Sequence, residues 1–122
     1  MPTSILQRYT STQLSIHFGH LTIRENIRPG WLLSINGNNL ELDFFIEELS
    51  IAIEVQGNQH YTYVPFMHGT YENFQAMIER DNTKKRKCFL AGIRLFEVSN
   101  QDECLETIEA IYQAEQETKK FI

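Results

Sequence analysis

Cysteine, proline and tryptophan are scarce in this chain of 122 residues, which contains 2 Cys, 3 Pro and 1 Trp. Two cysteines are too few for a disulfide framework and favour a reduced, cytoplasmic protein. No apolar run approaches the roughly 18–20 residues of a transmembrane helix, and no basic segment followed by an apolar stretch suggests export, so we expect no membrane partner. Internal repeats and linker-like stretches are also missing, which predicts one domain over residues 1–122.

Charge is present in both signs, with a formal balance of −5 that by itself argues against a nucleic-acid partner. The distribution of the charges weakens that argument. Residues 97–117 contain seven acids and no base, and residues 41–54 contain five acids and no base. The basic residues between positions 80 and 94 are Arg80, Lys84, Lys85, Arg86, Lys87 and Arg94, against the single acid Asp81. This basic cluster is either a solvated helix face or a local site for phosphate.

Hydrophobic periodicity predicts a mixed α/β domain. Helices are expected over residues 4–18, 71–91 and 102–116, and extended segments over residues 21–32, 40–46, 51–56 and 93–98. Thr10 and Thr12 are poor helix formers, so the first helix is expected to break or begin late. The last helix is expected to bury one side; its members are Cys104, Leu105, Ile108, Ile111 and Tyr112. Residues 57–69 have no clear period and are interpreted as a functional loop.

The hairpin formed by residues 40–56 places two carboxylates opposite each other. With a loop of two or four residues around Glu48, paired positions sum to 97, so Asp43 lies across from Glu54 and Glu41 across from Gln56. Like charges directly opposite each other are destabilising. A divalent cation is the usual reason to hold them together, and Mg²⁺ typically takes one or two carboxylates with waters and substrate phosphate. The alternative is a solvated hairpin face on which the repulsion is tolerated.

The long helix over residues 71–91 has a break in its apolar stripe. At helical spacing the stripe runs from Phe74 through Asp81 and Lys84 or Lys85 to Cys88. A charge on the inner face of a helix is costly unless it is paired or bound to a metal. Asp81 therefore either contributes to a site or forms a salt bridge with a neighbouring lysine.

His60 follows the second hairpin strand by four residues, close enough to reach the Asp43/Glu54 face. It either packs against Tyr61 or transfers a proton to a leaving group. The spacing of His and Cys does not suggest a zinc site.

An Asp on one hairpin strand, Glu-x-Gln on the next and a downstream Lys resemble the metal site of the PD-(D/E)xK nuclease superfamily, with Gln56 where the usual lysine stands. Further matching segments are NIRPGWL (26–32), LELDFF (40–45), IEVQGNQHY (53–61), FQ (74–75), RDNTK (80–84), Cys88 and GIRL (92–95). These segments resemble phage and bacterial endonuclease-like proteins related to very short patch repair endonucleases and to the homing endonucleases named for Glu, Asp, His and Asp. The resemblance implies a restriction-endonuclease-like core: a mixed central sheet with an antiparallel hairpin, flanked by helices.

The resemblance also implies roles for individual residues. The metal, Mg²⁺ or Mn²⁺, would be held by Asp43, Glu54 and the backbone carbonyl of Val55. The residues implied in catalysis are Asp43, Glu54, Gln56, His60, Asp81, Lys84 and Glu25. The residues implied in DNA binding are Arg28, Trp31, Tyr61, Tyr63, Arg80, Lys85, Arg86 and Lys87.

The expected function is Mg²⁺-dependent hydrolysis of phosphodiester bonds in DNA, inside a bacterial or phage-infected host cell, without a nucleotide cofactor. A homodimer is expected because one small domain has little surface for cutting both strands. Two alternatives stay open. One is a catalytically silent DNA-binding or assembly module that keeps the nuclease fold, and the other is an interaction protein that uses its acidic last helix.

Overall fold

The structure is a computed structural model that describes residues 4–56, 65 and 69–120. This part of the chain contains α1 (Ile5–Phe18), β1 (Ile23–Ile27), β2 (Leu42–Ile46), a 3₁₀ turn (Glu47–Leu49), β3 (Ile51–Val55), α3 (Tyr71–Leu90), β4 (Arg94–Val98) and α4 (Gln101–Lys119). The predicted mixed α/β class and the predicted order of elements are confirmed. None of the described helices is long and apolar enough to cross a membrane.

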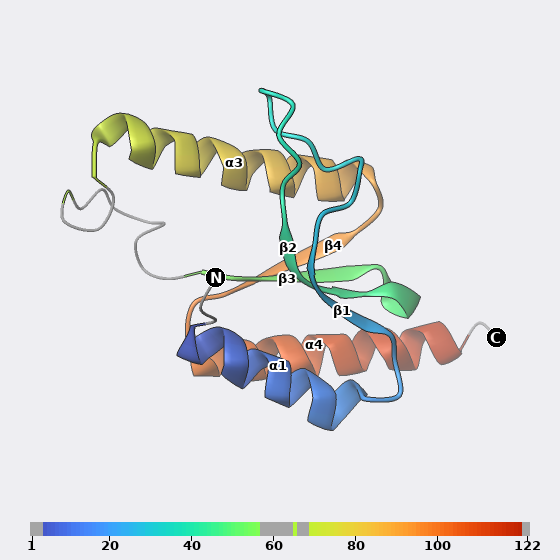
Figure 1. Cartoon of the computed structure of the whole chain (residues 1–122). Coiled ribbons are helices and arrows are strands. Elements are labelled where there is room, and N and C mark those ends of the chain that lie inside the picture. The colour runs from blue at the N-terminus through green and yellow to red at the C-terminus, as the bar shows by residue number, and fades with distance from the viewer. Residues whose placement is uncertain (1–3, 57–64, 66–68, 121–122) are drawn as a thin grey trace.

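The four strands form one mixed sheet in the order β1-β2-β3-β4 (Figure 1). β1 and β3 both pair antiparallel with β2, whereas β4 pairs parallel with β3. In the β2–β3 hairpin, Phe44 pairs with Ile53 and Ile46 with Ile51, so paired positions sum to 97 as predicted. The turn closes through Ser50, which takes a left-handed conformation with φ of 52°.

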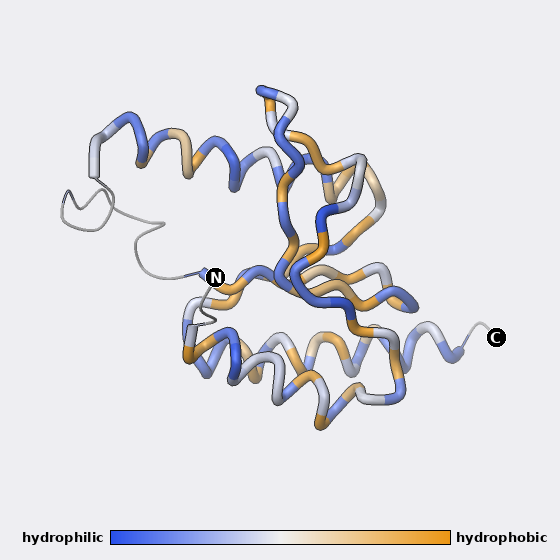
Figure 2. Tube along the Cα trace, in the orientation of Figure 1, coloured by the Kyte–Doolittle hydropathy of each residue, from blue (hydrophilic) through white to orange (hydrophobic). Residues whose placement is uncertain are grey.

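Helices cover both faces of the sheet: α3 lies on one face, and α1 with α4 on the other (Figure 1). The larger core lies on the α1/α4 side and includes Leu14, Phe18, Phe44 and Ile111. The smaller core contains Leu32, Leu40, Leu42, Ala52 and Cys88, the last of these from α3. Hydrophilic and apolar residues alternate along α3, whereas apolar residues are frequent in the sheet (Figure 2).

The first helix is continuous from Ile5 to Phe18, so the prediction that it breaks or begins late was wrong. The hydroxyl groups of Thr10 and Thr12 donate to the carbonyl oxygens of Leu6 and Arg8, one turn earlier. This bond satisfies the threonine hydroxyl inside a helix. Thr10 is also buried, so packing stabilises the helix at the position where its intrinsic propensity is weak.

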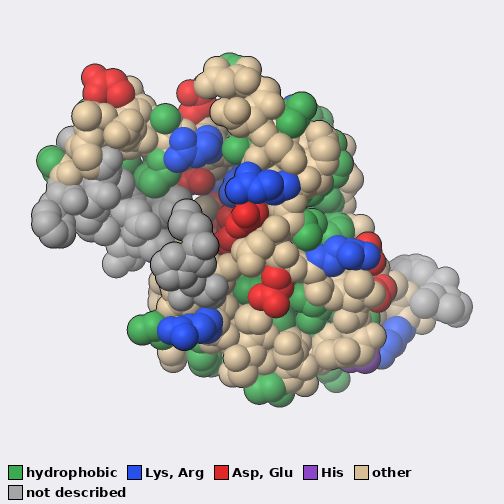
Figure 3. Space-filling view, in the orientation of Figure 1, with side chains coloured by type: hydrophobic (Ala, Val, Ile, Leu, Met, Phe, Trp, Pro, Cys, Tyr) green, Lys and Arg blue, Asp and Glu red, His purple; other side chains and the backbone are tan. Residues whose placement is uncertain are grey.

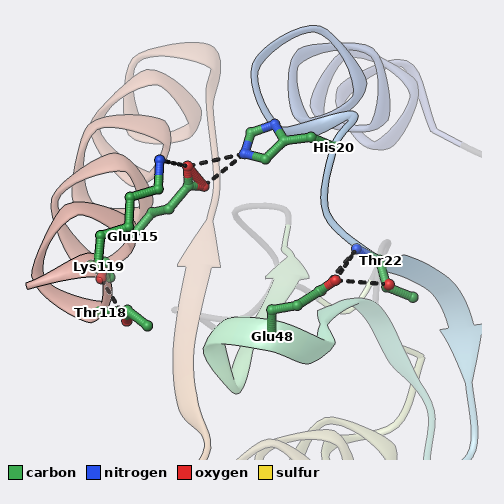
Figure 4. A network of polar contacts seen from close by, with 7 residues as sticks. His20, Thr22, Glu48, Glu115, Thr118 and Lys119 are labelled. Carbon is green, nitrogen blue, oxygen red and sulfur yellow. Dashed lines mark hydrogen bonds and ion pairs between the residues drawn. The ribbon is translucent and has the colours of Figure 1, made fainter. Parts of the chain in front are cut away.

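The predicted inner side of the last helix was partly wrong. Leu105 and Tyr112 are 47% and 51% exposed, whereas Thr107 and Glu115 are buried. Glu115 turns inward because His20, at the end of α1, places its Nε2 at 2.9 and 3.0 Å from the two carboxylate oxygens (Figure 4). A buried carboxylate needs such a partner, and this pair holds α1 against α4.

Candidate functional site

The β2–β3 ladder opens into a fork just beyond the pair Phe44–Ile53, and two carboxylates fill the opening. The backbone N–H of Asp43 donates to Glu54 Oε1 at 3.3 Å, and the N–H of Val55 donates to Asp43 Oδ2 at 2.8 Å. Each side chain therefore replaces a ladder bond that the opposite strand would otherwise supply. This exchange fixes the positions of both carboxyl groups, as the predicted register requires.

Glu54 is buried, which rules out the alternative of a solvated hairpin face. Its side chain is 8% exposed, and Lys84 Nζ from α3 lies 3.3 Å from Glu54 Oε2. Burial, and after it the neighbouring Asp43, raise the pKa of Glu54 to about 8 against the opposing effect of Lys84. A carboxyl group with such a pKa is poised to release its proton when a cation arrives.

Asp43 faces the same opening. Burial raises the pKa of Asp43, while its hydrogen bond from Val55 and the charge of Lys84 oppose that shift. The Val55 N–H points toward Asp43, and in a strand the C=O of a residue projects to the same side as its N–H. The Val55 carbonyl is thus directed at the fork, where the resemblance places it as a ligand.

The donor set fits a hard divalent cation. Two carboxylates and one backbone carbonyl are oxygen ligands, and Mg²⁺ completes such a set with waters and phosphate oxygens. Among the described residues no group of three or more His, Cys, Asp or Glu gathers closely enough to hold a metal. A cation at the fork would therefore need the backbone carbonyl, water or phosphate as further ligands. The observation in favour of a bound cation is that backbone hydrogen bonds hold two carboxyl groups together at a buried opening, where a cation would allow both to be ionised.

A cleft of about 720 Å³ opens onto the fork. Its lining comes from the end of β3, from α1, from α3, and from β1 and β2 with the segment 28–41 that connects them, here called the β1–β2 arm. The lining residues are Gln7, Asn26, Arg28, Leu40, Glu41, Asp43, Glu54, Val55, Gln56, Met77, Arg80, Asp81 and Lys84. Acidic and basic side chains gather around a hollow between α3 and the sheet (Figure 3). The predicted catalytic residues Gln56, Asp81 and Lys84 therefore share one cleft with the carboxylate pair.

The basic cluster of α3 is divided around the helix. Arg80 and Lys84, one turn apart, line the cleft. Lys85 forms an ion pair with Glu97 of β4 at 3.0 Å, and Arg86 lines a different hollow on the helix. Lys87 lies near the end of α3 and is partly buried. Successive residues on a helix point in different directions, so the run KKRK does not form one phosphate-binding face.

The β1–β2 arm places the other predicted residues at different distances from the fork. Arg28 is held at the cleft by Glu41 at 3.3 Å and by the carbonyl of Asn39 at 2.7 Å. Trp31 is 40% exposed and lines a separate hollow with Phe45. Glu25 is exposed, pairs in register with Phe44 and is not among the cleft residues.

His60, Tyr61 and Tyr63 lie outside the described residues. The structure adds residues that sequence reasoning missed, chiefly Gln7 of α1 and Asn26 of β1, both of which line the cleft. A residue of α1 gives no local signal of this position, because α1 reaches the cleft only through its packing against α4 and the sheet. Asn26 does carry a signal, since Asn tolerates the left-handed conformation it adopts here, with φ of 54°.

Comparison with known proteins finds viral relatives. The chain is 39% identical over 72 residues to an uncharacterized protein of Invertebrate iridescent virus 3, a match covering 58% of this chain and 37% of that protein. It is 44% identical over 63 residues to an uncharacterized protein of Frog virus 3 (51% and 41% covered) and 39% identical over 64 residues to one of Invertebrate iridescent virus 6 (52% and 32% covered). The matches span about two fifths or less of these relatives. No family model and no solved structure matches the chain.

Proposed function

We propose that this protein is a Mg²⁺-dependent DNA endonuclease with a restriction-endonuclease-like core of the PD-(D/E)xK type. The observation that carries the proposal is the fork, where Asp43 and Glu54 exchange hydrogen bonds with the opposite strand beside Lys84. A buried pair of carboxylates with a raised pKa is destabilising for the fold and is typical of a functional site.

Each residue of the fork has a distinct task in the proposed reaction. A bound divalent cation would lower the pKa of a water molecule and stabilise charge on the phosphate. Asp43 and Glu54 are preorganised by their backbone donors, so they need no rearrangement to hold that cation. Lys84 supplies the positive charge that Gln56 lacks, from the helix rather than from the strand. Arg80, one turn earlier on α3, is placed to contact a neighbouring phosphate.

The setting of the activity is part of the same proposal. The similarities found are to viral proteins, which supports action inside an infected cell. Both Cys88 and Cys104 are free and buried, as expected in a reducing compartment. A second copy of the chain would give a pair of active sites for cutting both strands.

The direct test is cleavage of plasmid, mismatched and branched DNA with Mg²⁺ or Mn²⁺ and with EDTA. We expect metal-dependent cleavage by the parent and a loss of at least about 100-fold in Asp43→Ala. Glu109→Ala, which removes an exposed acid of α4, is the matched control and should cleave as the parent does. Absence of cleavage of all three DNAs with metal present, or full activity in Asp43→Ala, would rule out the endonuclease.

The second candidate is a catalytically silent DNA-binding module with the same fold. Gln56 favours it, because a neutral amide occupies the strand position where the resemblance expects a lysine. This candidate predicts DNA binding that weakens steeply with salt, no cleavage, and binding that is unchanged in Asp43→Ala.

A further inference from the structure

Asn26 is the conformational exception of β1. It has a φ of 54°, in the left-handed region, although it lies inside an antiparallel strand. The flanking pairs Glu25–Phe44 and Ile27–Leu42 place it level with Asp43 on the neighbouring strand. Residues held in such a conformation inside regular structure cluster at active sites and ligand clamps. The side chain of Asn26 lines the cleft.

A second amide completes this wall of the cleft. Gln7 Nε2 from α1 donates to Asn26 Oδ1 at 3.2 Å. Whichever way the two amides are turned, one such bond leaves one carbonyl and one NH₂ group free. Within the described chain neither side chain has a further hydrogen-bond partner. The pair therefore offers one acceptor and one donor side by side, in the same cleft as Asp43 and Glu54.

A third amide, that of Gln56, lines the cleft at the end of β3. Gln56 is only 6% exposed, lines the same cleft and makes no side-chain hydrogen bond to the described residues. No buried side-chain nitrogen or oxygen of the described residues lacks a hydrogen-bond partner, so the Gln56 amide atoms are accessible from the cleft. The amide is therefore available to a polar ligand in this part of the cleft.

The cleft has a cationic side and a side with neutral amides. α3 contributes the cations Arg80 and Lys84, whereas α1 and β1 contribute the amides of Gln7 and Asn26. Arg28 also lines the cleft, but its charge is paired with Glu41 at 3.3 Å. α1 and α3 lie on opposite faces of the sheet (Figure 1), so the two groups flank the carboxylate fork from opposite sides. A nucleotide has the matching division, with a charged phosphate and a neutral base. The volume of about 720 Å³ suits one or two nucleotides of a single strand and not a stack of base pairs.

We propose that the amide pair Gln7–Asn26 binds the base of an unpaired nucleotide next to the phosphate at the fork. The Watson–Crick edge of every DNA base carries a donor beside an acceptor, and both are occupied in a duplex. An unpaired base can therefore satisfy the two free amide groups, while Arg80 and Lys84 hold its phosphate. This inference rests on the proposed endonuclease and defines its substrate class as DNA with an unpaired nucleotide.

Nucleotide fragments test the base contact directly. NMR titration in Mg²⁺ would compare dAMP with 2-deoxyribose 5-phosphate, which lacks the base. We expect dAMP to bind the parent at least about fivefold more tightly, as one or two neutral hydrogen bonds provide. Asn26→Gly fits the left-handed backbone without strain and removes only the amide, so dAMP should bind no more tightly than the sugar phosphate. Gln7→Ala, a change that suits a helix, should reduce the preference in the same way.

A cleavage assay then separates the two proposals. Substrates would be a duplex and the same duplex with one unpaired nucleotide, and the readout is the ratio of their cleavage rates. Parent protein that prefers dAMP through Asn26 but cleaves neither DNA overturns the endonuclease and keeps the base site. Parent protein that cleaves DNA, while Asn26→Gly and Gln7→Ala leave both the dAMP preference and the cleavage ratio unchanged, overturns the base site and keeps the endonuclease. Isosteric Asn26→Asp, which lacks the amide donor, repeats the test should Asn26→Gly fail to fold.

Discussion

Replacing Glu54 with glutamine should change how the stability of the protein depends on pH. Glu54 is buried beside Asp43, and its pKa is raised from 4.5 to about 8 by burial first and by Asp43 second. The substitution keeps the shape of the side chain and removes the ionisable proton. It therefore isolates the free energy that the metal-free fold loses when this carboxyl group ionises.

The sign follows from proton binding. Between pH 4.5 and 8 the native state keeps a proton on Glu54 that the unfolded state has already released. The contribution of Glu54 to the free energy of unfolding is therefore fully present below pH 4.5 and is lost as the pH rises from 4.5 through 8. The pKa difference sets a ceiling of about 5 kcal/mol on this loss. Even a third of that ceiling is a large part of the stability of a small domain.

The assay is urea denaturation in EDTA at several values of pH between 5 and 8.5. Every titrating group contributes in the parent, so the quantity of interest is the free energy of unfolding of Glu54→Gln minus that of the parent. We expect this difference to rise with pH. Glu97→Gln is the matched control, because Glu97 is the register neighbour of Glu54 on β4 and also pairs with a lysine.

Two results would contradict the reasoning. One is a difference between Glu54→Gln and the parent that stays constant with pH, and the other is the same rise in Glu97→Gln. Mn²⁺ provides a further check, because at pH 8 it should stabilise the parent by about 2.7 kcal/mol at 100 times its dissociation constant. Glu54→Gln should gain much less from Mn²⁺.

Three further predictions concern single contacts. Lys84→Met should lower metal-dependent cleavage at least about tenfold. At pH 5, where the native Glu54 is protonated, it should change the free energy of unfolding by less than about 1 kcal/mol. Cleavage at the parent rate would show that the contact between Lys84 and Glu54 is only structural. His20→Ala should destabilise the protein by about 1–2 kcal/mol in urea, because among the described residues it leaves the buried Glu115 with Lys119 alone, at 3.5 Å; an unchanged midpoint would contradict this. Ser50→Gly should raise the thermal midpoint, because glycine accepts the φ of 52° without the penalty of about 1–2 kcal/mol that an L-residue has in the left-handed region, and this exceeds the entropy cost of glycine of about 0.5–1 kcal/mol; a lower midpoint would argue against strain in this turn.

Much of the secondary structure could be predicted because it depends on local periodicity. The alternation of apolar residues located β2 and β3, and the even loop length set their register, so the meeting of Asp43 and Glu54 followed from counting. The errors arose where tertiary packing overrides local preference. Thr10 stays helical because it is buried, and Glu115 points inward because its carboxylate pairs with His20.

The first inference from the sequence was that a net charge of −5 argues against nucleic acid, and that its uneven distribution matters more. The structure refines both parts of this inference. Only Arg80 and Lys84 of the basic cluster reach the cleft, whereas Lys85 is neutralised by Glu97. Along the chain these residues are neighbours, but a helix turns successive side chains by about 100° and separates them.

The sequence alone determined the class of fold, the carboxylate pair and the chemistry that such a pair suits, because each depends on the order and spacing of nearby residues. Tertiary structure alone decided that Glu54 is buried, that Lys84 reaches it from α3, and that Gln7 and Asn26 line the same cleft. Gln7 and Lys84 are 77 positions apart in the chain. Only the packing of α1 and α3 on opposite faces of one sheet brings them to the same opening, and no local pattern encodes that distance.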